Sequence, residues 1–136
     1  MQDAAIGLGH CKVLFGNRKC IQIVDDDPAI CDALKFQLEL EGHVVRTHRS
    51  GVSLLSDCLL AAADCLVLDC RMPEMDGFDV LIELDRRSVK APVIMITAPV
   101  SETLRRRAKE KGVLVLLEKP LLDNVLLIAV REAMSA

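Results

Sequence analysis

Acidic and polar side chains follow apolar runs at several points along the chain. Asp25 and Asp26 follow the run CIQIV, Asp69 follows DCLVL, and Thr97 ends VIMIT. Lys119 comes shortly after VLVLL. Each residue alone has an ordinary explanation, since a strand-end Asp often caps a turn and Thr favours strands. Their repetition at the ends of apolar runs indicates one shared site.

Carboxylates gathered at one site would repel one another and raise each other's pKa unless a cation lies among them. A hard divalent cation with oxygen ligands fits this set, and Mg²⁺ is the expected ion because it binds through one or two carboxylates and keeps several waters. Mn²⁺ is the expected substitute. No C-x-x-C pair or spaced His ligand accompanies the acidic residues, so the sequence does not predict a zinc site.

An ammonium and a hydroxyl beside such a metal site indicate phosphoryl chemistry. Lys119 and the cation would neutralise the phosphoryl oxygens while a carboxylate oxygen attacks in line. Asp69 is the preferred nucleophile because it stands alone at the end of a central strand, whereas Asp25 and Asp26 are better placed as metal ligands. Asp27 is assigned to helix capping.

The segments that must position these residues alternate between short apolar runs and longer runs with helical periodicity. Five short apolar strands are predicted between helical segments, at 20–24, 44–48, 64–68, 93–97 and 113–117. Helices are predicted after Asp27 to about Gly42, around Leu54–Leu59, from about Asp76, over 101–111 and over 122–134. This alternation predicts an α/β fold with a doubly wound parallel sheet, whose ligands bind at the carboxyl ends of the strands.

The composition is that of one globular domain. The chain has 136 residues, 51% hydrophobic and 27% charged, with a formal net charge of −3 and 2% aromatic residues. These values give no basis for nucleic-acid binding by this domain or for a membrane span. Most of the cysteines are expected to be buried and reduced, and no signal peptide is recognised, so a cytoplasmic location is expected. Residues 1–18 are expected to be a poorly ordered extension and 19–136 the domain.

Four motifs together resemble the receiver domain of two-component response regulators, within the CheY-like superfamily. They are IVDDDP at 23–28, LVLDCRMPEMDG at 66–77, VIMITA at 93–98 and LEKP at 117–120. The chain is most similar to the FixJ-type branch. The resemblance implies a flavodoxin-like (βα)5 fold with strand order 2-1-3-4-5.

The resemblance also implies a role for each site residue. Asp69 would accept a phosphoryl group from a histidine kinase or phosphotransfer protein, and Thr97 would be the switch hydroxyl. Asp25, Asp26, Asp69 and the backbone carbonyl of Arg71 would hold Mg²⁺. Ala98 and Cys70 would lie next to the phosphate, and the bond before Pro120 would be cis, which aims Lys119 into the pocket.

Two residues depart from the family pattern. Leu116 occupies the position that usually carries a switch Tyr or Phe, so the usual aromatic readout is not expected. Pro99 removes a backbone donor beside the pocket. The resemblance further implies that a homodimer or an output domain uses the face of the fourth helix, fifth strand and fifth helix. The basic stretch at 105–111 is interpreted as a solvated face or as part of that surface.

Three functional hypotheses follow. The first is a phosphorylation-controlled signalling switch, either standing alone or excised from a longer protein with a DNA-binding helix-turn-helix domain. The second is a receiver-like interaction module that does not depend on phosphate. The third, a phosphohydrolase, would require a catalytic acid two residues after Asp69, where the chain has Arg71. The expected class is therefore a phosphoacceptor signalling domain rather than an enzyme.

Overall fold

A parallel sheet forms the centre of the molecule. The computed structural model describes residues 15–135, and its five strands lie in the order β2-β1-β3-β4-β5. Their bounds are β1 Cys20–Val24, β2 Val44–His48, β3 Cys65–Asp69, β4 Val93–Thr97 and β5 Val115–Glu118. Every residue of β1, β3 and β4 is buried, as the apolar runs predict for strands covered on both faces. The predicted doubly wound fold and strand order are confirmed.

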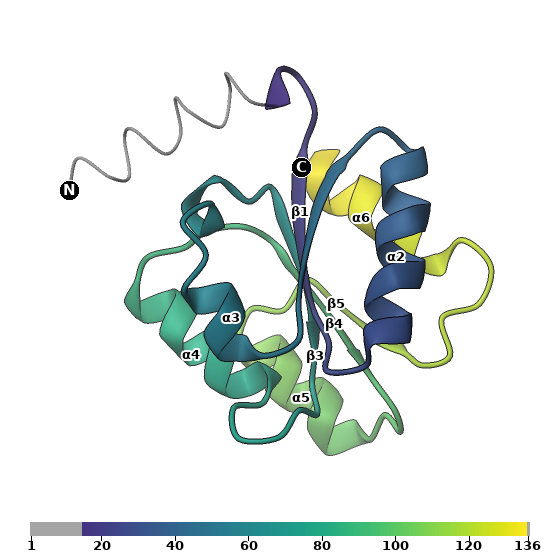
Figure 1. Ribbon diagram of the computed structural model, residues 1–136. Helices are drawn as coiled ribbons and strands as arrows, with labels where there is room; N and C mark the ends of the chain where they lie inside the picture. Colours follow the sequence, from purple (N-terminus) through teal and green to yellow (C-terminus); the bar gives the residue numbers. More distant parts are fainter. Residues whose placement is uncertain (1–14, 136) are drawn as a thin grey trace.

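Helices cover both faces of the sheet. They are α2 Pro28–Leu40, α3 Gly51–Leu55, α4 Gly77–Arg86, α5 Glu102–Glu110 and α6 Val125–Ser135, with a short 3-10 turn η1 at Leu60–Ala62. Figure 1 shows α2 and α6 on one side of the sheet and α3, α4 and α5 on the other. Two apolar clusters fill the two interfaces between helices and sheet. Within residues 15–135, no helix combines the length and apolar character that crossing a bilayer requires.

The helix ends follow the capping residues in the sequence. The Asp27 carboxylate accepts a hydrogen bond from the Ala29 N–H at 2.9 Å, and Pro28 occupies the first turn of α2. At the other end, Gly42 takes a φ of 93°, a backbone conformation that L side chains rarely adopt. The predicted roles of Asp27 as cap and Gly42 as stop are confirmed.

The second helix is shorter than predicted. Hydrophobic residues through Leu59 suggested one continuous helix, but α3 ends at Leu55 and Cys58 is exposed. The cause is Asp57, whose carboxylate accepts a hydrogen bond from the Leu59 N–H at 2.9 Å and from Arg46 Nε at 2.7 Å. These bonds hold the chain in a turn that competes with further helix.

Smaller differences concern element boundaries. The third strand covers 65–69 rather than 64–68, which makes Asp69 its last residue. The fifth strand begins at Val115 and the last helix at Val125, both later than predicted. Four cysteines are buried as expected, namely Cys20, Cys31, Cys65 and Cys70. Most of the expected extension at 1–18 lies outside the described residues, so that boundary stays a prediction.

Candidate functional site

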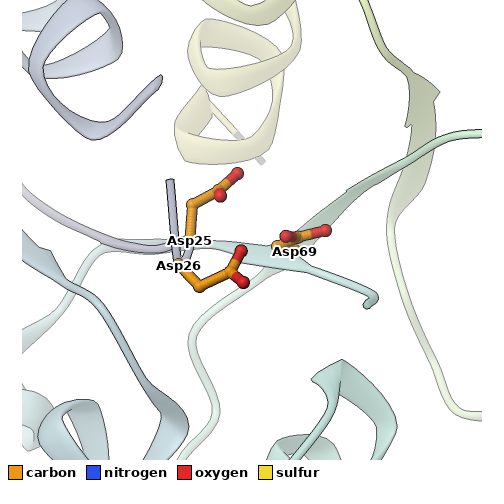
Figure 2. A group of neighbouring side chains, drawn as sticks. All are labelled: Asp25, Asp26 and Asp69. Atoms are coloured by element: carbon orange, nitrogen blue, oxygen red, sulfur yellow. The ribbon is translucent and has the colours of Figure 1, made fainter. Parts of the chain in front are cut away.

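Three carboxylates gather at the carboxyl edge of the sheet. Asp25 and Asp26 directly follow β1, and Asp69 ends β3 (Figure 2). One oxygen from each carboxylate lies within 4.8 Å of the other two. Asp25 and Asp69 are buried, with 0% and 3% of their surface exposed, whereas Asp26 is exposed. The cluster therefore combines two buried carboxylates with one that is exposed to solvent.

The sheet register explains this meeting of distant residues. In the parallel pairing of β1 with β3, Val24 lies beside Leu68, so Asp25 and Asp69, the next residue of each segment, lie at the same edge of the sheet. The backbone then fixes the side chains. The Asp25 carboxylate accepts from the Asp27 N–H at 2.9 Å, and the Asp69 carboxylate accepts from the Arg71 N–H at 3.2 Å.

Lys119 supplies the positive charge of the site. Its Nζ lies 3.0 Å from Asp25 Oδ2 and 3.4 Å from Asp69 Oδ2. Burial alone would lower the pKa of Lys119, but the contacts with Asp25 and Asp69 outweigh it and raise that pKa above its usual value. The Lys119–Pro120 peptide bond is cis, as the resemblance implied, and the Ala98–Pro99 bond is also cis.

Asp69 is a carboxyl group with an unfavourable environment for its charge. Burial and the neighbouring Asp25 raise the pKa of Asp69 to about 6, against the opposing effects of the Arg71 N–H and Lys119. The Lys119 ammonium pairs with Asp25 and Asp69, while Asp26 adds a third carboxylate to the cluster. The excess of negative charge is what a divalent cation would neutralise.

The donor set fits Mg²⁺, and Mn²⁺ by the same chemistry. The ligands are carboxylate oxygens, which hard cations prefer, and no His or Cys belongs to the group. Asp25 Oδ2 accepts no hydrogen bond of good geometry from the described residues, although it is ion-paired with Lys119. That buried oxygen has capacity for a ligand. The Arg71 carbonyl remains a predicted ligand.

Thr97 brings a hydroxyl to the same edge. It ends β4, is 1% exposed, and its Oγ1 makes no hydrogen bond of good geometry with the described residues, although it interacts with the neighbouring Cys70 thiol. The neighbouring Cys70 is also buried, and burial raises the pKa of its thiol to about 11, so it remains protonated at neutral pH. Ala98 lines a groove together with Lys119. A buried hydroxyl without a hydrogen bond of good geometry has capacity for a stronger partner that enters the site.

Gly77 allows the turn after Asp69 to pack closely. A Cβ at Gly77 would lie 2.7 Å from the Asp69 carbonyl oxygen and 2.5 Å from Met95 Cε. The Gly77 N–H donates to the Cys70 carbonyl at 3.0 Å, which closes the turn. The missing side chain at Gly77 therefore lets α4 approach the backbone at the end of β3.

Leu116 lies away from the carboxylates, on β5. It is partly buried and packs on the apolar cluster beneath α4 and α5. Its register partner is Met95 of β4, two residues before Thr97. The position of the usual aromatic residue is thus filled by an aliphatic side chain within the core.

A second polar group lies beside the first and was missed from the sequence. His48 ends β2 and its carbonyl accepts from the Asp25 N–H at 3.0 Å. Its ring contacts Gln22 and Ser53, each at 2.7 Å, and Asp57 at 3.2 Å. Gln22 is fully buried within β1, and a polar residue inside the run CIQIV was the available indication.

Comparison with known proteins gives a consistent result. The sequence model of the response regulator receiver domain matches residues 21–131. The chain is 33% identical over 114 residues to the transcriptional regulatory protein FixJ of Azorhizobium caulinodans, covering 84% of this chain and 54% of FixJ. It is 34% identical over 128 residues to the response regulator protein TodT of Pseudomonas putida, covering 94% and 55%. The chain thus spans about half the length of these relatives.

Solved structures agree with the fold. The crystal structure of FixJ-N superposes with a TM-score of 0.77 and 29% identity, covering 88% of this chain and 95% of that chain. The Vibrio cholerae chemotaxis protein CheY4 gives a TM-score of 0.79 and 25% identity, covering 85% and 98%.

Proposed function

This chain belongs to the response regulator receiver domain family of two-component systems, and we propose that it is a phosphorylation-controlled switch whose phosphoacceptor is Asp69. The observation that supports this most is the burial of Asp69 within 3.4 Å of Lys119 and beside Asp25 and Asp26. A carboxylate so placed has a cation partner for an incoming phosphoryl group. The neighbouring carboxylates of Asp25 and Asp26 offer the oxygen ligands that Mg²⁺ prefers.

The residues divide the chemistry among them. One Asp69 oxygen attacks phosphorus, and the donor imidazole leaves as the P–N bond breaks. Lys119 neutralises one phosphoryl oxygen, and Asp25, Asp26 and the Arg71 carbonyl are proposed to hold Mg²⁺. The bound cation would offset the charge on the phosphoryl oxygens in the transition state. The domain is proposed to assist a reaction in which it is itself the acceptor, so we class it as a phosphoacceptor rather than an enzyme.

Thr97 is the proposed sensor of the phosphoryl group. Its buried hydroxyl interacts with the Cys70 thiol but makes no hydrogen bond of good geometry with the described residues, and it would gain one from a phosphoryl oxygen, which would favour a second conformation of the segment after β4. Leu116 would respond to this change by repacking its aliphatic side chain, since it has no aromatic ring to rotate. The output surface is proposed to include α5, β5 and α6. Leu114, which directly precedes β5, is 55% exposed, and Val125 and Ile128 of α6 are 41% and 50% exposed.

The donor is proposed to be a histidine kinase or a phosphotransfer protein, located in the cytoplasm. A groove of about 470 Å³ borders the site and runs from Lys119 and Pro120 to Ile30 and Leu34. The outer face of α2 continues it with Ala29, Ala33, Phe36 and Leu40, whose alternating spacing of four and three residues is typical of a helix-packing seam. Phe36 and Leu40 are 65% and 71% exposed. A donor helix packed there would place its phosphohistidine near Asp69.

A direct experiment tests this function. The protein is incubated with Mg²⁺ and acetyl phosphate, and its intact mass is measured beside that of Asp69→Asn. We expect the mass of one phosphoryl group on the wild-type protein, its loss in the variant, and its loss when EDTA removes the metal. Absence of both the adduct and Mg²⁺ binding would instead support a phosphate-independent interaction module.

What the domain controls is a further proposal. The relatives named above include a transcriptional regulatory protein, and each is about twice as long as the matched region. We propose that the switch acts on an output partner or output domain through the α5, β5 and α6 surface, or through a homodimer formed there. Nucleic-acid binding is not assigned to this domain.

A further inference from the structure

The second polar group aligns a serine, a histidine and an aspartate. Ser53 Oγ lies 2.7 Å from His48 Nδ1, and His48 Nε2 lies 3.2 Å from Asp57 Oδ2. Ser53 is exposed, whereas His48 is 7% exposed and the Asp57 side chain is 2% exposed. The arrangement therefore runs from a buried carboxylate, through an imidazole, to a hydroxyl at the surface.

The contacts on the far side of the ring determine which nitrogen carries the hydrogen. His48 Nε2 faces the Asp57 carboxylate, which can only accept, and Gln22 Oε1 at 2.7 Å. Nε2 must therefore be the donor in the neutral ring. Nδ1 is then the free base, and it faces the Ser53 hydroxyl.

Arg46 keeps the carboxylate in place. Its Nε lies 2.7 Å from Asp57 Oδ2, the same oxygen that faces His48. Burial acts to raise the pKa of Asp57, but the Arg46 hydrogen bond, the Leu59 N–H and the charges of Arg46 and His48 hold that pKa below its usual value. Asp57 is thus charged at neutral pH and orients the ring. A base that is itself oriented by a third group is the arrangement that activates hydroxyl nucleophiles.

From this geometry we propose that Ser53 is a base-activated nucleophile that accepts an acyl group from small activated esters, a reaction separate from the proposed phosphorylation of Asp69. Ser53 Oγ forms a bond to the carbonyl carbon, and the bond from that carbon to the leaving phenoxide breaks. The hydroxyl proton passes to His48 Nδ1 and then to the phenoxide or to solvent. The product is an ester on Ser53.

Ser56 provides a matched comparison within the same segment. It follows α3 as its C-cap, is exposed as Ser53 is, and is three residues away in the sequence. The contacts of His48 involve Ser53 and not Ser56. If exposure alone decided acylation, the two serines would react equally.

The experiment uses p-nitrophenyl acetate as the probe at neutral pH. Because Cys58 is an exposed free thiol that would also react, every protein carries Cys58→Ala. Peptide mass spectrometry measures acetylation at each serine over time in this parent and in Ser53→Ala, Ser56→Ala, Asp57→Asn and His48→Gln. Thermal unfolding of each variant shows whether it folds.

We expect Ser53 to acquire acetyl roughly 100-fold faster than Ser56, a typical contribution of a positioned general base. Ser56→Ala should leave that rate unchanged, while His48→Gln and Asp57→Asn should lower it. Ser53→Ala changes only an exposed side chain, so it provides a folded protein that should lose the label. Equal labelling of the two serines, or an unchanged Ser53 rate in His48→Gln, would overturn the proposal.

Discussion

The two polar groups of this domain both involve strand β1 but balance their charges in different ways. At the edge of the sheet, three carboxylates gather, those of Asp25, Asp26 and Asp69, and the Lys119 ammonium pairs with Asp25 and Asp69. Beside them, the Asp57 carboxylate meets one guanidinium, that of Arg46, and both nitrogens of the His48 ring are occupied.

The difference indicates where an external ion is needed. The first group carries excess negative charge, and among the described residues its buried Asp25 Oδ2 and Thr97 Oγ1 make no hydrogen bond of good geometry. In the second group the polar atoms are paired with one another, apart from the Ser53 hydroxyl at the surface and the buried Gln22 amide nitrogen, which has no hydrogen-bond partner among residues 15–135. A cation should therefore bind only the first group. The second group should instead affect the free energy of unfolding and the reactivity of Ser53.

The largest expected difference concerns metal affinity. Asp25→Asn and Asp57→Asn each convert a buried carboxylate to an amide, one in each group. Because losing even an outer partner of a metal ligand costs roughly 10- to 100-fold in affinity, Asp25→Asn should weaken Mg²⁺ binding by at least about 100-fold. Asp57→Asn should leave it nearly unchanged. Isothermal titration calorimetry measures both, and equal losses would show that the two groups are not distinct.

The next difference concerns packing. Ala at Gly77 would place a Cβ 2.7 Å from the Asp69 carbonyl, whereas Ala at Gly51 would meet the side-chain ends of Val80 at 2.6 Å and Met75 at 2.8 Å. Backbone cannot move aside as easily as flexible side chains. Gly77→Ala should therefore lower the free energy of unfolding by roughly 1–3 kcal/mol and Gly51→Ala by less.

Urea denaturation of the two glycine variants measures this order. A larger loss in Gly51→Ala than in Gly77→Ala would mean that the turn after Asp69 is softer than its contacts indicate. Mg²⁺ binding by Gly77→Ala should weaken as well, since that turn carries the proposed Arg71 ligand.

The smallest expected effect is a pH dependence that arises in the second group. Burial lowers the pKa of His48, against the raising effect of Asp57, so the unfolded chain binds this proton at a higher pH than the folded protein does. The contribution of His48 to the free energy of unfolding should therefore be fully present above about pH 6.5, the ordinary pKa of a histidine. This contribution should fall as the pH drops from that value toward the lower pKa that His48 has in the folded protein. His48→Gln should lose this part of the pH dependence.

Urea titrations between about pH 7.5 and 5 compare the two proteins. His43 also has a pKa lowered mainly by burial, but it is present in both proteins and cancels in the difference. An identical slope in wild type and His48→Gln would contradict the assignment.

Much of the fold was predictable because its determinants are local. Continuous apolar runs identified β1, β3 and β4, and Asp27, Pro28 and Gly42 marked the ends of α2. Parallel strands then bring their carboxyl ends to one edge, so Asp25, Asp69 and Lys119 could be placed together without coordinates. The second helix was predicted too long because Asp57 is engaged by Arg46, a contact between residues eleven apart in sequence.

The second polar group could not be predicted for a related reason. No spacing along the chain connects His48 with Gln22, which lies within an otherwise apolar strand. Their meeting depends on the pairing of β1 with β2, in which Gln22 lies beside Arg46 and His48 beside Val24. Side-chain reach across strands, rather than spacing along the chain, makes the contact.

The central claim is that Asp69 is the phosphoacceptor, and the most direct measurement identifies the modified residue chemically. After incubation with Mg²⁺ and acetyl phosphate, borohydride reduces an aspartyl phosphate to homoserine, which peptide mass spectrometry assigns to a position. We predict homoserine at position 69 alone, and none when EDTA is present. Homoserine at another aspartate such as Asp25 or Asp26, or at position 69 without a divalent cation, would contradict the account.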